Sequence, residues 1–165
     1  MLGILAILAA SSCCNNSCCR PRCCCCCCSS SELPTFVPAR GTGTFEGPLV
    51  FPVDAGVAIN LPFAFSDLKN MDEDYNAFII ERAGTYRICY AVEAALDTAA
   101  EVSAFIQLTR NGVVTNHAIE EVSPSASDCE SIVLAAGDEV RLALETAAGG
   151  MLAVENAMMT VKRMA

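Results

Sequence analysis

Bulky apolar side chains occupy every second position of GTYRICYAVEA, residues 84–94. One set is apolar and large: Tyr86, Ile88, Tyr90 and Val92. The set between them is charged or small: Arg87, Cys89, Ala91 and Glu93. Because successive side chains of a strand point to opposite faces, this period of two predicts a β-strand with one face in a core. No stretch of useful length shows a period that favours a helix.

The same alternation continues further along the chain. In VSAFIQLTR it separates Val102, Ala104, Ile106 and Leu108 from Ser103, Phe105, Gln107 and Thr109. Asn111 and Gly112 follow at once, and both tolerate the positive φ that a two-residue type I′ turn requires. These residues therefore predict a hairpin whose return strand is VVTNHAIEEV, residues 113–122.

Further strands are expected at short, regular intervals. Their candidate ranges are 49–53, 57–63, 77–83, 131–134, 139–145 and one or two strands within 151–165. In the range 139–145, Val140, Leu142 and Leu144 should point inward. Strands every 8–14 residues with turn signals between them predict an all-β fold, an antiparallel jelly-roll sandwich of about ten strands over residues 47–165.

The chain before this domain has a different composition. Residues 1–10 form a short apolar run, residues 11–32 are rich in cysteine, and residues 33–46 are expected to be a Pro/Gly-punctuated linker. The Cys-rich segment has no aliphatic side chains from which to build a core, so we expect it to be disordered until it is cross-linked. Ten cysteines lie in it: Cys13, Cys14, Cys18, Cys19, Cys23, Cys24, Cys25, Cys26, Cys27 and Cys28.

The apolar run 1–10 is too short to span a membrane, which takes roughly 20 residues. It has no Lys or Arg ahead of it, so it is not a convincing signal peptide, and the same lack argues against a lipoprotein site at Cys13. We expect a hydrophobic plug that docks on a partner or on copies of itself. Residues 33–165 hold eight basic and 18 acidic residues, a net charge of −10 that disfavours nucleic acid as a partner.

The spacing of the ten cysteines favours cross-linking between chains over an ordered metal site. No set of CxxC pairs suits zinc, and no CxxC begins a helix as redox catalysis would need. In an extended run, consecutive cysteines point in opposite directions, so they suit bridges to two neighbours. Binding of a soft metal stays open as an alternative. Cys89, on the polar face of its strand, and Cys129, expected in a turn, either pair or remain two separate thiols.

Little else in the sequence indicates chemistry. His117 is the only histidine and is expected to be an ordinary strand or loop residue. The acidic run 72–74 lacks the ligand spacing of an EF-hand, so a solvated loop is favoured over a calcium site. Asp138 should stabilise its turn through backbone hydrogen bonds. Since no nucleophile elbow, phosphate loop or spaced carboxylate pair is present, we expect no enzymatic activity and no cofactor.

Three motifs occur in a characteristic order. They are Gly84, Tyr86, Ile88 and Tyr90 on one strand, the Arg-Asn-Gly hairpin with Asn111 and Gly112, and the step Leu134, Ala136, Gly137, Asp138, Val140 and Leu142. Over residues 44–165 the chain resembles the globular heads of complement component one-q and tumour necrosis factor, in the bacterial form that ends collagen-like exosporium glycoproteins. The resemblance implies a ten-stranded jelly roll that forms homotrimers and has no enzymatic activity.

The collagen-like Gly-X-Y stalk of those glycoproteins is absent, and the Cys-rich segment stands in its place. We therefore expect a structural protein at the spore surface or in another extracellular surface layer. Its trimeric head would be displayed outward and anchored to coat proteins by disulfides. An adhesion or ligand-binding module, and metal binding through the Cys-rich segment, are the alternatives.

Overall fold

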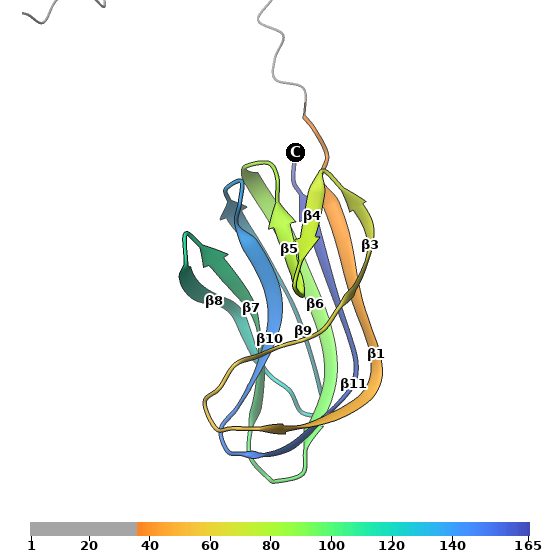
Figure 1. The fold of residues 1–165 in the computed structure, drawn as a ribbon, viewed down its shortest axis with the longest axis vertical. Coiled ribbons are helices and arrows are strands. Elements are labelled where there is room, and N and C mark those ends of the chain that lie inside the picture. Colours follow the sequence, from red (N-terminus) through yellow and green to blue (C-terminus); the bar gives the residue numbers. More distant parts are fainter. Residues whose placement is uncertain (1–35) are drawn as a thin grey trace, which may run out of the picture. The chain divides into compact units, whose positions relative to one another are not determined.

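Residues 36–165 are described by the structure, a computed structural model. They form an all-β sandwich of two antiparallel sheets that pack face to face (Figure 1). Its strands are β1 (Arg40–Val53), β2 (Ile59–Asn60), β3 (Ala64–Lys69), β4 (Met71–Asp74), β5 (Ala77–Ile80), β6 (Gly84–Leu96), β7 (Val102–Arg110), β8 (Val113–Glu121), β9 (Ser125–Leu134), β10 (Glu139–Thr146) and β11 (Gly150–Arg163). The predicted antiparallel jelly roll is confirmed.

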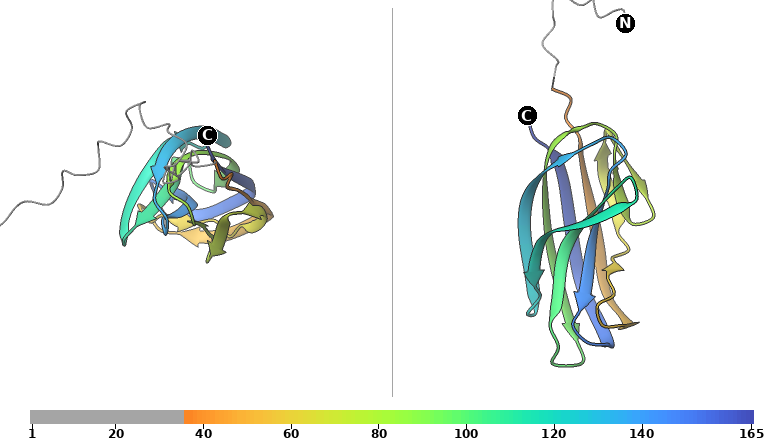
Figure 2. Two further views of the ribbon diagram at one scale, coloured as in Figure 1. Left: turned by 90° about the horizontal axis from the view of Figure 1, so that it is seen from above. Right: turned by 90° about the vertical axis from the view of Figure 1, so that its left-hand side faces the viewer.

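Most strands that lie side by side in a sheet are not consecutive in the sequence. One sheet has the order β3-β1-β11-β6-β9, so the first and last long strands lie side by side, as Figure 2 also shows. The other has the order β4-β5-β10-β7-β8, with β2 paired to β10. Strands β8 and β9 lie at the same edge of the sandwich, each as the last strand of its sheet, and contact each other there.

The core lies between the sheets and is built from the alternating residues of the long strands. Tyr86, Ile88, Tyr90 and Val92 of β6 are all buried, as are Val102, Ala104, Ile106 and Leu108 of β7 and Val140, Leu142 and Leu144 of β10. The predicted inward faces of these three strands are therefore confirmed. The β7–β8 hairpin is also as predicted, since Asn111 and Gly112 both have positive φ, 50° and 77°.

Strand β1 corrects the predicted linker at residues 33–46. It begins at Arg40, and its first glycines face the core. A Cβ on Gly41 would lie 2.6 Å from a ring carbon of Phe78, and one on Gly43 would lie 2.9 Å from a ring carbon of Phe63. The glycines that suggest a linker are thus strand residues whose missing side chains make room for aromatic rings.

The acidic run 72–74 is a strand rather than the solvated loop we predicted. Asp72, Glu73 and Asp74 belong to β4, at the edge of its sheet, and all three are exposed. Charged side chains on an exposed edge strand discourage pairing with another chain. Within residues 36–165 there is no helix of the length and apolarity that crossing a membrane takes.

Candidate functional site

A disulfide joins Cys89 of β6 to Cys129 of β9 on the outward face of the sheet. The two residues are direct partners in the register, and their Cα atoms lie 4.0 Å apart, the close approach of a non-hydrogen-bonded pair. Cys129 is therefore a strand residue, not the turn residue that we expected, because β9 begins at Ser125 instead of Ser131. Of the two alternatives for these cysteines, pairing is the one found.

The ten cysteines of residues 13–28 and the apolar run 1–10 lie outside the described residues. Their predicted roles in cross-linking and docking stay predictions. Within residues 36–165, the disulfide accounts for both cysteines.

A buried carboxylate ties two turns together. Asp138 is 3% exposed at its side chain, and Arg110, the last residue of β7, donates to it from both Nε and Nη2. The Ala135 N–H donates to Asp138 Oδ2 at 2.8 Å, as the predicted turn role requires. Burial alone raises the pKa of Asp138, but the hydrogen bonds from Arg110 and Ala135 and the charge of Arg110 outweigh it and hold the pKa below its ordinary value.

The motif residues of β6 make structural contacts at the end of the sandwich and in its core. Gly84 leaves room for Arg163, whose Nε would lie 2.5 Å from a Cβ at that position. The Tyr86 hydroxyl donates to the carbonyl of Arg82 at 2.7 Å. Ile88 is fully buried, and Tyr90 crosses the core toward the other sheet. These positions hold the fold, and none of them lines a reaction site.

Tyr90 stabilises the edge of the sandwich at which β8 and β9 meet. Its hydroxyl donates to the Ala118 carbonyl of β8 at 2.8 Å and lies 3.1 Å from the Ala104 carbonyl of β7. Burial raises the pKa of Tyr90 above its ordinary value, and the charges of Asp128 and Glu120 act in the same direction. The phenol therefore stays protonated and remains a hydrogen-bond donor across the physiological pH range.

Replacement of Tyr90 by Phe should lower the free energy of unfolding by about 1–2 kcal/mol, because the buried hydrogen bond to the Ala118 carbonyl is lost. Urea denaturation at pH 7 would measure the change. Tyr75→Phe is the matched control, since Tyr75 is 89% exposed, and it should leave the midpoint unchanged. Equal midpoints for Tyr90→Phe and the wild type would contradict the stabilising role.

His117 faces β9 from β8. Its Nδ1 lies 3.5 Å from Glu130 Oε1, and its Nε2 lies 3.3 Å from Thr115 Oγ1. Among the described residues, no three His, Cys, Asp or Glu side chains gather as a metal site would require. The histidine is thus part of the contact between two edge strands.

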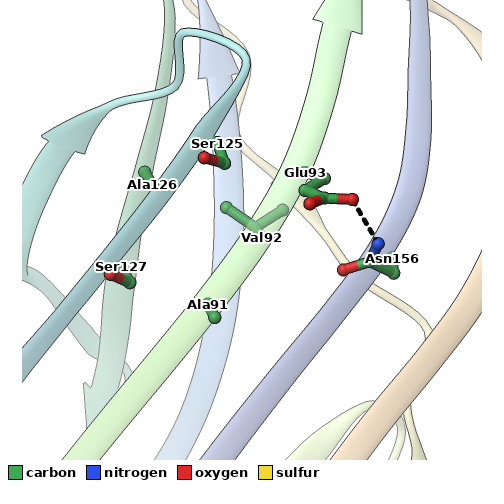
Figure 3. A pocket seen from close by; sticks show the side chains of 7 residues that line it. All are labelled: Ala91, Val92, Glu93, Ser125, Ala126, Ser127 and Asn156. Atoms are coloured by element: carbon green, nitrogen blue, oxygen red, sulfur yellow. Dashed lines mark hydrogen bonds between the residues drawn. The ribbon is translucent and has the colours of Figure 1, made fainter.

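A hollow of about 270 Å³ lies on the outward side of β6 and β9 (Figure 3). The side chains that line the hollow are small or polar: Ala91, Val92, Glu93, Ser125, Ala126, Ser127 and Asn156. Glu93 is the one titratable group in it, and its carboxylate accepts a hydrogen bond from Asn156 Nδ2 (Figure 3). This set offers neither a nucleophile with a base nor paired acids for catalysis.

The partner of Asp138 is the residue that sequence reasoning missed. Arg110 lies next to Asn111 in the Arg-Asn-Gly hairpin, 28 residues before Asp138. In the sequence, Arg110 and Asp138 are two charged residues at two separate turns. Only the pairing of β7 with β10 brings those turns together. The disulfide depends in the same way on the pairing of β6 with β9.

Comparisons with solved structures agree with the fold. The Eiger TNF structure from S. frugiperda is similar with a TM-score of 0.56 at 14% identity, over 77% of this chain and 94% of that one. Murine APRIL, solved at pH 8.5, is similar with a TM-score of 0.57 at 8% identity, over 76% of this chain and 99% of that one. No family model and no curated protein sequence matches the chain. At such identities the likeness concerns the fold alone: residues 36–165 have a jelly roll of the tumour necrosis factor type.

Proposed function

We propose that this protein is a non-enzymatic structural protein of a bacterial surface layer, the spore exosporium or coat. In this proposal a trimeric jelly-roll head is displayed outward. The Cys-rich segment, residues 13–28, anchors the head through disulfides between chains and to other coat proteins.

The observation that carries the proposal is the disulfide between Cys89 and Cys129. Structural disulfides persist where the surroundings are oxidising, as at cell and particle surfaces, and are rare where thiols are kept reduced. In the same surroundings the thiolates of residues 13–28 would be converted to disulfides, by oxidation or by exchange with an existing disulfide. Binding of a soft metal needs thiolates, so the head disulfide favours cross-linking over the metal alternative.

Exposed apolar side chains support association of the heads. On the outward face of the β3-β1-β11-β6-β9 sheet, Val50, Met151 and Met158 are 55%, 41% and 46% exposed. On β8, Val113, Val114 and Ile119 are 63%, 53% and 60% exposed. Apolar side chains exposed on different strands suit a heterologous contact, in which β1 and β11 of one copy meet β8 of the next and the ring closes.

Strand β11 adds only part of its apolar residues to this surface. Met158 faces outward, whereas Ala157, Met159 and Val161 face the core. Thr160 and Lys162 give the outward face a polar end. The apolar part of that face therefore lies toward Met151.

Sizing of the full-length protein with and without reductant tests the proposal. We expect a trimer under native conditions that persists after reduction, and covalent ladders above it that collapse when reductant is added. A matched variant with Ser at all ten cysteines of residues 13–28 should keep the trimer and lose the ladders. A monomer after reduction would contradict the trimer, and ladders that resist reductant would contradict cross-linking.

A further inference from the structure

The Cys89–Cys129 disulfide lies at the open edge of its sheet. Strand β9 pairs with β6 on one side and with no other described strand of that sheet. Cys129 is exposed, whereas Cys89, one strand further in, is half-buried. The backbone N–H of Cys129 donates to Oδ1 of the preceding residue, Asp128, at 2.6 Å. A local partner of this kind is expected for a residue of an edge strand, which has no strand beyond it.

This position leaves a path for a nucleophile to one of the two sulfurs. Thiolates displace a disulfide sulfur in line with the bond that breaks. On the side of Cys129 away from Cys89, no strand of the sheet lies beyond β9. On the side of Cys89 away from Cys129, β11 pairs with β6 and places Thr160 beside Cys89. Access therefore favours attack at Cys129.

The charges near Cys89 point the same way. Arg87 lies two residues before Cys89 on the same face, and Lys162 is the partner of Arg87 on β11. Within residues 36–165 neither cation has a carboxylate at ion-pair distance. Neighbouring cations favour a thiolate, so Arg87 and Lys162 assist the departure of Cys89 as a leaving group.

We propose that Cys129 is the acceptor sulfur through which the head is joined to the Cys-rich segment of a second copy. A thiolate from residues 13–28 of that copy attacks Cys129 Sγ, a new S–S bond forms, and the Cys89 thiolate leaves. One disulfide is broken and one is made, so the step needs no oxidant. The inference rests on the proposed cross-linking function and adds to it an entry point in the head.

The released Cys89 thiolate gives the link a second property. It remains beside the mixed disulfide and can attack Cys129 again, which restores the head disulfide and frees the segment. Links through Cys129 are thus reversible as long as free thiolate is present. An assembling layer could use this reversal to correct wrongly placed chains before its cross-links accumulate.

The test maps disulfides in assembled full-length protein. Equal amounts of ¹⁴N- and ¹⁵N-labelled chains are assembled together, quenched with an alkylating agent at acidic pH, digested without reduction and analysed by mass spectrometry. We expect peptides that join Cys129 to residues 13–28, with both isotopes in one linked pair. Reductant-sensitive ladders in which residues 13–28 link only to one another would overturn this inference and leave the proposed function standing. Absence of any such ladder would overturn the proposed function itself.

Exchange with glutathione tests which sulfur is attacked. We expect adducts on Cys129 to exceed those on Cys89 by about tenfold, because access and leaving-group charge act together. The exposed substitution Arg87→Gln keeps the disulfide and should slow the exchange about threefold, whereas Thr85→Ser on the same strand should not change it. Equal adducts on both sulfurs, or a rate unaffected by Arg87→Gln, would contradict the assigned roles.

Discussion

Replacement of Ile88 by Ala is expected to lower the free energy of unfolding by about 3 kcal/mol, within the range for Ile→Ala in a closely packed core. Ile88 is fully buried in the middle of β6, between its partners Val161 on β11 and Glu130 on β9. Truncation removes apolar area from the core and leaves a cavity that the paired strands on both sides cannot fill. Chemical denaturation in the background of the variant with Ser at all ten cysteines of residues 13–28 would measure the loss without interference from cross-links.

The matched control is Val133→Ala on the neighbouring strand. Val133 is 69% exposed, so its truncation should change stability by less than about 0.5 kcal/mol. If both variants lost the same amount, the inward and outward faces of these strands would have been assigned wrongly.

Replacement of Asp138 by Asn is expected to lower the free energy of unfolding by about 2 kcal/mol at pH 7. The amide keeps the shape of the side chain but loses the charge-assisted hydrogen bonds from Arg110, which are stronger than neutral ones. Thermal or urea denaturation would measure the difference. Asp74→Asn, at an exposed position of β4, is the control and should have almost no effect.

The loss caused by Asp138→Asn should depend on pH with a definite sign. The folded-state pKa of Asp138 lies below its ordinary value, so the ionised form stabilises the fold at every pH above the unfolded value of about 4. As pH falls below that value and through the depressed pKa, the wild type takes up a proton and loses this contribution. The difference between wild type and variant should therefore shrink in acid. A difference that grew in acid would contradict the ion pair with Arg110.

The strands could be predicted from the sequence because their signal is local. The period of two along β6, β7 and β10 places each side chain on one of two faces, and the buried faces are those predicted. Asn111 and Gly112 likewise specify their turn by their own tolerance of positive φ. Local alternation does not say whether the second face is also covered: Phe105 and Ala143, on the opposite faces of β7 and β10, are buried too.

The start of the domain could not be placed in this way. Gly41 and Gly43 resemble linker residues by composition, and their role appears only when Phe78 and Phe63, from later strands, lie over them. A glycine in a linker and a glycine under an aromatic ring give the same local sequence. The difference lies in a contact between distant segments.

By itself, the sequence determined the fold class, the inward faces of the long strands and the β7–β8 hairpin. Each of these depends on residues within a few positions of one another. Only the tertiary structure decided that β9 lies beside β6, which pairs Cys89 with Cys129, and that Arg110 meets Asp138. Their separations of 40 and 28 residues carry no periodic signal. Such partners are selected by the order in which strands join a sheet, and that order comes from burial of the whole core at once.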